Sequence, residues 1–581
     1  MLRPLAAAAL AVGLFATDVS AQVLRGGTSG DTPRRPVSTA TAITNARVVV
    51  SPDRVLDRAT VIVRDGRIVA VDEDAEIPFE AQIIEGDSLW VYAGFLDLYA
   101  RAGVDAPDAP DYDGDRGDPP REVAGIVPDR DVRTLYDPAD NAVKALREAG
   151  FTAAHLVPKD GLFAGMGAVA LLRQPGRAET TTSVFLPQTE TAIAQIDGAR
   201  GVYPATPMGV LSVMRETVEN ARREMGSREA FSRDASRALR PSYSPVMDAL
   251  APVLAGDRAL VFHADSWLNA HRALRVTEEM EIPQTVLAGV PDVVPVLEKL
   301  RQRGVPFIAP LALPDTVAAD SLAREITLPP ATQAAPGGVS FVTDRRTVSF
   351  RDTDAETGAL TAQRIASVQR AEASPARLAQ AEIAFGFGSF DAKGGDVRDN
   401  LRRMVEAGLS REAALTALTT GAAEIVGLEN ALGTVERGKL ANLVVTTGDY
   451  FADSTDVRFV FVEGVRHEIE ARKKKASGDP NAVVTATGTW TYSVTTPAGA
   501  QTGTLTITGE AGDLSGEIET DGDVSPLNSV TLEGDLITFT FTIQGGPDVS
   551  VSGTISGDEF EGTADVGSFG SFPMTATRQP E

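Results

Sequence analysis

The strongest constraint on the fold is a long run of alternating strand-like and helix-like segments from Gly94 to about Ala423. Residues 140–149, for example, have helical periodicity, and 151–157 form a buried strand directly after them. Such alternation favours a parallel α/β sheet, because each helix returns the chain to the edge from which the next strand starts. A segment of this length suits a closed sheet better than an open one. The pattern therefore predicts a (β/α)₈, TIM-like barrel over residues 94–425.

Short strand patterns lie on both sides of this segment. On the amino-terminal side, an Asp65-Gly66 turn separates two apolar runs, which is a strong hairpin signal. On the carboxyl-terminal side, short strands resume after the last predicted helix. We expect the two flanks to pair, so that residues 42–93 and 426–471 build one small β-sandwich domain.

The last hundred residues have a different composition, rich in Thr, Gly, Val and Ser. Alternating strands recur there about every ten residues and are separated by Gly-Asp and Asp-Gly turns. Residues 472–486 are basic and then turn-rich, which is typical of a linker. Residues 487–581 are accordingly predicted to form an all-β barrel or sandwich of about eight strands.

The first residues have the pattern of a secretory signal. A basic Arg3 precedes the apolar run Leu5–Ala16, and Val19-Ser20-Ala21 forms a small-x-small cleavage site. This predicts a signal peptide over residues 1–21, followed by a flexible linker over 22–41. No later apolar run is long enough to span a bilayer. We therefore expect a periplasmic or secreted protein with no membrane span after the signal is removed.

Composition excludes several classes of function. The net charge of −26 opposes binding to nucleic acid, whose phosphates are themselves negative. The absence of Cys rules out a disulfide framework, a thiolate nucleophile and a Cys-based zinc site. With 581 residues, the chain is longer than one hydrophobic core usually supports, so two or more domains are expected.

Four segments resemble the amidohydrolase superfamily, nearest to its imidazolonepropionase-like, exported bacterial branch. They are Gly94-Phe-Leu-Asp97, Glu148-Ala-Gly-Phe-Thr-Ala-Ala154, residues 408–427 and, most specifically, residues 432–445 (LGTVERGKLANLVV). The resemblance implies a hydrolase of carbon–nitrogen bonds other than peptide bonds, and a small amide as substrate. It also implies a divalent metal, held by histidines and an aspartate at the ends of barrel strands.

At nearly every position that matches the family's metal ligands, this chain has another residue, and His263 is the exception. The first-strand pair is Tyr99 and Arg101, and Ala288 and Gly388 occupy two further positions. Arginine is a permanent cation and cannot ligate a metal. Asp391, three residues after Gly388, is a candidate catalytic group. The resemblance therefore implies a metal whose ligands are largely absent, and the cofactor is left open.

The chain contains only four histidines. His155 lies among apolar residues in a strand and is predicted to be a hydrogen-bonded core residue. His271 is expected at the surface, and His467 ends a strand of the small β-domain. His263 follows the apolar run Leu260–Phe262 and is the candidate for the catalytic site. One histidine cannot hold zinc without help from carboxylates.

Three hypotheses follow for the function. The chain is either an exported amidohydrolase-like hydrolase with a degraded metal centre or a catalytically inactive binding or scaffold protein on the same fold. The third hypothesis is a hydrolase without a metal, in which His263, Asp265 or Asp391 acts as general base. Whether the chain is an enzyme is not decided by the sequence, because fold does not imply function.

Overall fold

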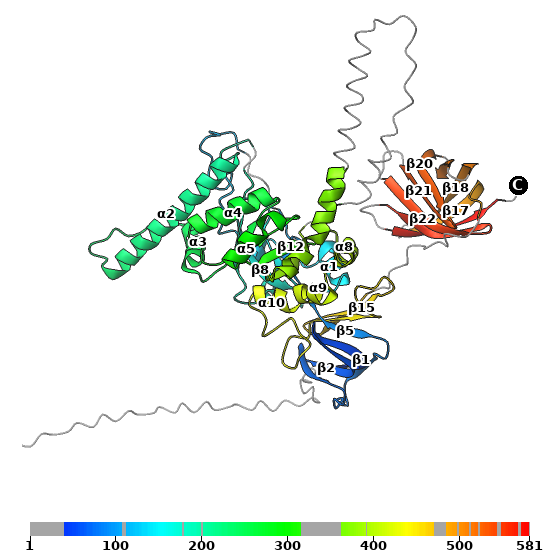
Figure 1. The fold of residues 1–581 in the computed structure, drawn as a ribbon, viewed down its shortest axis with the longest axis horizontal. Coiled ribbons are helices and arrows are strands. Elements are labelled where there is room, and N and C mark those ends of the chain that lie inside the picture. Colours follow the sequence, from blue (N-terminus) through cyan, green and yellow to red (C-terminus); the bar gives the residue numbers. More distant parts are fainter. Residues whose placement is uncertain are drawn as a thin grey trace, which may run out of the picture. The chain divides into compact units, whose positions relative to one another are not determined.

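The computed structural model describes residues 40–106, 112–176, 179–198, 201–314, 362–390, 392–469, 484–496, 499–510, 513–520, 523–542, 548–566 and 571–579. The chain divides into two compact units (Figure 1). The first comprises residues up to 452 together with 459–467, and the second comprises 453–458 and the residues from 468 onward. The predicted signal peptide and most of both predicted linkers lie outside the described residues.

The first unit contains a small sheet built from both flanks of the barrel segment, as the sequence predicts. Its eight strands are β1 (Thr41–Ser51), β2 (Arg54–Arg64), β3 (Arg67–Asp72), β4 (Gln82–Glu85), β5 (Trp90–Ala93), β14 (Leu443–Thr446), β15 (Val457–Val462) and β16 (Val465–Glu468). The strand order is β16-β15-β14-β5-β1-β2-β3, with β4 beside β1. Asp65 and Gly66 both have positive φ in the turn between β2 and β3, which confirms the predicted hairpin.

This small sheet is one hydrogen-bonded sheet, so the prediction of a two-sheet sandwich is wrong. The main-chain N–H of Ile68 in β3 donates to Lys439 O at 3.0 Å, just before β14, so the far edge of the sheet curls back. Curling lets one twisted sheet enclose a core that includes Val61, Leu443 and Phe461.

The second sheet of this unit spans the segment that is predicted to form the barrel. Its strands are β6 (Phe95–Ala100), β7 (Phe151–Leu156), β8 (Phe163–Leu171), β9 (Thr191–Gln195), β10 (Leu260–His263), β11 (Thr285–Ala288), β12 (Phe307–Pro310) and β13 (Phe385–Gly388), hydrogen-bonded in that order. A parallel bridge between Ala100 and Phe390 brings the two edges together, so the sheet is nearly closed. The fold of this region is mixed α/β (Figure 1).

Helices follow most of these strands. They are α1 (Asn141–Glu148), α2 (Pro207–Arg233), α3 (Pro245–Ala255), α4 (Trp267–Glu279), α5 (Leu297–Arg303), a helix over 362–380, α8 (Gly394–Glu406), α9 (Arg411–Leu418) and α10 (Thr420–Ile425). Among the described residues, no helix is long and apolar enough to cross a membrane.

Strand β8 departs from the predicted parallel barrel. It runs antiparallel to both of its neighbours, β7 and β9. The physical reason is the length of the connection, because only residues 157–162 join β7 to β8. A parallel pair needs a crossover of a dozen or more residues, whereas an antiparallel pair needs only a short turn.

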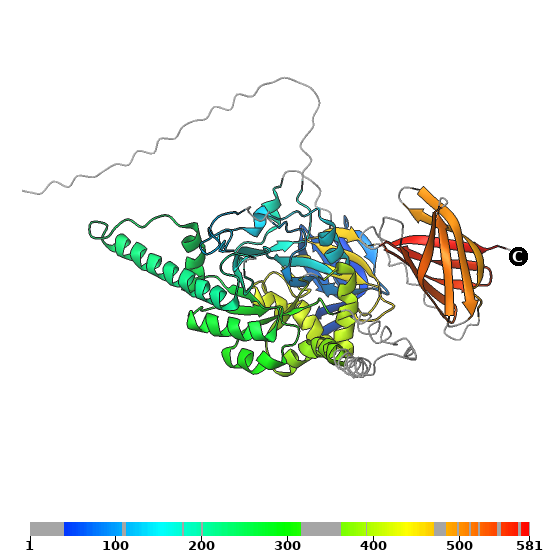
Figure 2. The same cartoon turned by 90° about the horizontal axis from the view of Figure 1, so that it is seen from above.

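The second unit contains a closed barrel of eight antiparallel strands (Figure 2). The strands are β17 (Gly488–Thr496), β18 (Gly499–Glu510), β19 (Asp513–Thr520), β20 (Asp523–Glu533), β21 (Leu536–Thr542), β22 (Asp548–Ser556), β23 (Glu559–Asp565) and β24 (Ser571–Arg578). Each strand pairs with the next, and β24 closes onto β17. Trp490, Phe539 and Val551 fill the interior. The prediction of an eight-stranded all-β region is confirmed in its barrel form.

Candidate active site at the barrel mouth

Strand β6, at one edge of the barrel sheet, carries Asp97. Its carboxyl group is fully buried, and Oδ1 accepts hydrogen bonds from the main-chain N–H of Tyr99 at 2.9 Å and of Ser389 at 3.0 Å. Burial raises the pKa of Asp97 to about 6, and the hydrogen bonds from Ser389 and Tyr99 oppose that rise only in part. Asp97 thus ties the first strand of the sheet to the last.

Tyr99 fills the space beside Asp97 with an aromatic stack. Its ring is fully buried and lies 4.4 Å from the Phe390 ring, at an interplanar angle of 17°. The His263 ring stacks on Tyr99 at 5.4 Å, and the guanidinium carbon of Arg101 lies 5.6 Å from the Tyr99 ring centroid. Three of the residues singled out from the sequence, Tyr99, Arg101 and His263, therefore meet at one place.

His263 is the last residue of β10, and two neighbouring strands fix its position. In the parallel register it lies beside Gln195 of β9 and Ala288 of β11. Gly289 makes room for the imidazole, since a Cβ at position 289 would lie 2.6 Å from His263 Cδ2. Gly289 also has a φ of +94°, which glycine adopts readily.

A small polar cavity of about 210 Å³ opens beside His263. Its lining residues are Arg101, Asp160, Gln195, Ile196, Asp197, His263, Ala264, Asp265 and Asn269. Within this cavity, Asn269 Nδ2 donates to Asp265 Oδ1 at 2.7 Å, which holds the Asp265 side chain in place. One guanidinium, one imidazole and three carboxylates can together recognise a small molecule that has both donors and acceptors.

His155 lies in the same sheet but takes no part in this cavity. Its Nδ1 lies 2.9 Å from Leu98 O, and its Nε2 lies 2.8 Å from Thr191 Oγ1. Burial lowers the pKa of His155 to about 4, so the ring is neutral at physiological pH. The prediction of a hydrogen-bonded core histidine is confirmed.

The residues present do not fit the metal site that the family resemblance implies. Ala288 contributes only a methyl group beside His263, and Gly388 has no side chain. A Cβ at position 388 would lie 2.7 Å from Tyr99 Cβ and 2.9 Å from Phe390 Cε2, so these two packed side chains leave no space for a carboxylate there. In the part of the chain that the structure describes, no group of three His, Asp or Glu side chains could hold a metal ion. Asp391 lies outside the described residues.

Comparison with known proteins agrees with this fold. The amidohydrolase family model matches residues 342–466. An amidohydrolase from Thermotoga maritima aligns with 74% of this chain and 100% of its own, at 18% identity and a TM-score of 0.56. Residues 342–466 are thus similar to the amidohydrolase family, and the fold is similar to that of the Thermotoga maritima protein. No curated protein matches it.

Two further solved structures align less closely with this amidohydrolase-like chain. A prolidase complexed with N-methylphosphonate-L-proline covers 74% of the chain and 100% of its own, at 18% identity and a TM-score of 0.42. The ochratoxinase of A. niger covers 74% and 96%, at 14% identity and a TM-score of 0.39.

Several residues at the barrel mouth are not predicted from the sequence. Phe390 cannot be recognised from the sequence, because nothing in its local pattern shows that it stacks on Tyr99, 291 positions earlier in the chain. Gln195 carried a usable signal, since it is the one polar residue at the carboxyl end of the apolar strand Thr191–Gln195. Asp197 and Asn269 are surface-type residues, and only the fold shows that they line a cavity.

Proposed function

We propose that this chain is an amidohydrolase-fold protein that binds a small amide or a related polar molecule at the barrel mouth and performs no metal-dependent hydrolysis there. The supporting observation is the stack of Tyr99, Phe390 and His263, which occupies the point where the family's ligands would converge. Beside it, Arg101 contributes a positive charge that repels a metal cation. The polar cavity next to the stack has a volume of about 210 Å³, and groups of both charges line it.

Metal analysis of the purified chain tests this proposal. After incubation with zinc and removal of the excess, we expect much less than one metal ion per chain. His263→Ala should leave that ratio unchanged, as should the control His271→Ala at a half-buried position of α4. Stoichiometric zinc that is lost in His263→Ala and kept in His271→Ala would overturn the proposal.

A second candidate function is hydrolysis without a metal. It is favoured by the position of His263, which lines the cavity together with the carboxylates of Asp160, Asp197 and Asp265. In this reading His263 is the general base and removes a proton from the attacking water. Dipeptides, hydantoins and lactams should be assayed in the presence of a chelator. If the wild type turns these substrates over in the presence of the chelator and His263→Ala does not, the chain is a hydrolase without a metal and not only a binding protein.

We further propose that the nearly closed sheet is a (β/α)₈-type barrel in which one strand, β8, is reversed. Its supports are the strand order and the parallel bridge between Ala100 and Phe390. We also propose export to the periplasm or the medium, from the signal pattern in the first 21 residues. Amino-terminal sequencing of the mature protein tests export, and we expect a start at Gln22.

A further inference from the structure

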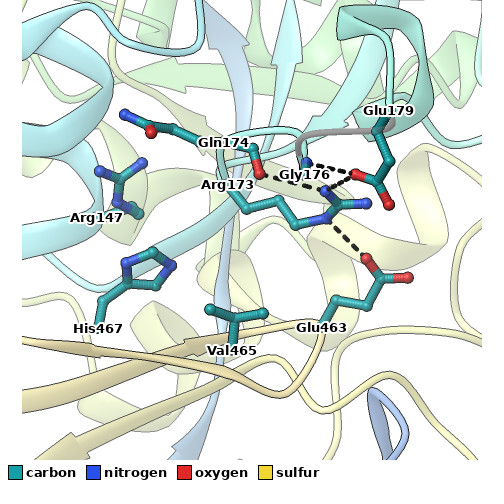
Figure 3. Close-up of a pocket in the computed structure, with 8 residues that line it drawn as sticks. All are labelled: Arg147, Arg173, Gln174, Gly176, Glu179, Glu463, Val465 and His467. Atoms are coloured by element: carbon teal, nitrogen blue, oxygen red, sulfur yellow. Dashed lines mark hydrogen bonds and ion pairs between the residues drawn. The ribbon is translucent and has the colours of Figure 1, made fainter. Parts of the chain in front are cut away.

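A second recess lies in the first unit, away from the barrel mouth. It has a volume of about 630 Å³, and barrel segments and the β15–β16 hairpin form its walls (Figure 3). Its lining residues are Arg147, Arg173, Gln174, Gly176, Glu179, Glu463, Val465 and His467. None of them belongs to the candidate active site.

Arg147 is the unusual member of this set. It lies in the last turn of α1, its side chain is only 9% exposed, and its Nη1 donates to Leu172 O at 3.1 Å. It forms no ion pair with a carboxylate of the described residues. Burial lowers the pKa of Arg147, and the nearby Tyr136 and Glu148 oppose this only in part. A buried guanidinium without a carboxylate partner is energetically costly and favours an anionic ligand.

Arg173 provides the contrast within the same recess. Its Nη1 lies 2.6 Å from Glu179 Oε2, and its Nε lies 2.8 Å from Glu463 Oε2 (Figure 3). Glu179 also accepts a hydrogen bond from the main-chain N–H of Gly176 at 2.9 Å. Both carboxylates of the recess are therefore engaged with Arg173, and neither neutralises Arg147.

His467, close to Arg147, has an unsatisfied ring nitrogen. Its Nε2 is buried and has no hydrogen-bond partner among the described residues. Burial and the positive charge of Arg147 both lower the pKa of His467. The ring is therefore neutral at physiological pH and has one N–H to donate. The torsional wells about its Cβ–Cγ bond are broad, so we expect the ring to turn when a ligand enters.

We propose that this recess binds a small organic carboxylate, with its oxygens on Arg147 and His467 and its apolar part against Val465. The planar guanidinium matches a carboxylate through paired N–H donors. The volume falls within the range of small-molecule pockets. The site is separate from the function proposed for the barrel mouth and does not depend on it.

Calorimetric titration of the full chain with benzoate tests this assignment, with benzamide as the neutral isostere and inorganic phosphate as a second anion. We expect benzoate to bind with a millimolar Kd and benzamide not to bind. Arg147→Met should weaken benzoate binding at least tenfold, because a charge-assisted hydrogen bond is lost. The control Lys144→Met removes an exposed cation from the same helix and should change the affinity less than twofold.

Arg147 also anchors α1, so a second variant guards against misfolding. Val465 is 52% exposed and forms one wall of the recess, so Val465→Trp should fill the recess and abolish binding while the chain stays folded. The proposal is overturned if benzoate does not bind up to about 10 mM. It is also overturned if benzamide binds equally well, if phosphate alone binds, or if Arg147→Met and Val465→Trp both retain full affinity.

Discussion

At the scale of single residues, Asp97 is a carboxyl group that is buried in the barrel sheet without a neighbouring cation. Asp97 is enclosed by two strands and has hydrogen-bond donors but no cation among the groups that shift its pKa. Its oxygen Oδ1 joins β6 to the residue that follows β13. The carboxyl group therefore contributes a structural link whose strength depends on its protonation state.

The raised pKa of Asp97 predicts that the stability of the folded chain depends on pH. Its pKa is about 6 in the folded chain against 3.8 in the unfolded reference, so between these values the folded state keeps a proton that the unfolded state has lost. Stability therefore falls as the pH rises through this window. Asp97→Asn keeps the accepting oxygen and should be more stable than the wild type above pH 6, by up to about 3 kcal/mol. Urea unfolding from pH 3 to 8 measures this, and a difference that does not vary with pH would contradict the account.

Gly388, at a position that matches a metal ligand of the family, has no space for a larger side chain. A Cβ there would lie within 3.0 Å of Tyr99, Phe390 and Ile308, so Gly388→Ala should lower the free energy of unfolding by about 1–3 kcal/mol. Gly395→Ala is the matched control, since no atom lies within 4 Å of its Cβ. The control should leave stability unchanged or raise it slightly. Chemical denaturation of both variants gives the comparison, and equal effects would count against the packed-ring explanation.

The sequence predicts part of the candidate site, because strand ends can be recognised from local patterns. Tyr99, Arg101 and His263 each end or follow an apolar strand, and the fold brings all three together. The stack with Phe390 could not be predicted, because it depends on which strands close the sheet. The space made by Gly289 likewise depends on the register between β10 and β11.

At the scale of elements, the segments between helices and strands determine where each helix ends and in which direction the next strand runs. Gly150 and Gly304 follow α1 and α5, and both have positive φ, which is typical of helix ends. The direction of β8 was not predictable from its own residues, since an apolar strand has the same pattern in either direction. Only the short connection after β7 fixes its direction.

The side chain of Asn442 joins the small sheet to the barrel through two hydrogen bonds. Its Nδ2 donates to Thr152 Oγ1 at 3.1 Å, and its Oδ1 accepts from the main-chain N–H of Glu463 at 2.8 Å. Asn442→Ala removes both hydrogen bonds, and Glu463 loses its main-chain N–H partner, so the variant should lower the free energy of unfolding by about 1–3 kcal/mol. Asn141→Ala, at an exposed position of α1, is the control and should cost much less. Thermal unfolding monitored by far-UV circular dichroism measures both, and a neutral Asn442→Ala would refute this role.

At the scale of the whole molecule, the chain is two units, each with its own hydrophobic core. The curled sheet of the first unit is packed around residues such as Val48 and Phe461, and the closed barrel of the second around Trp490 and Phe539. The sequence anticipates this division because its composition changes sharply after the predicted linker at residues 472–486.

The second unit should therefore fold by itself. Trp490 is the single tryptophan of this unit, is 1% exposed, and donates from Nε1 to Ala486 O at 3.0 Å. A fragment spanning residues 484–579 should unfold cooperatively, with the emission maximum of a buried tryptophan. Calorimetry of the full chain should show a transition that matches the fragment. A fragment that is unfolded in buffer would contradict the independence of this unit.

The closed barrel also limits how this unit can meet other chains. Because every strand has a neighbour on both sides, its main-chain groups are not available as a template for a strand from another molecule. An open sheet of the same Thr- and Val-rich composition would be prone to edge-to-edge aggregation. Any partner must therefore recognise the side chains of the outer wall or the loops at its two ends.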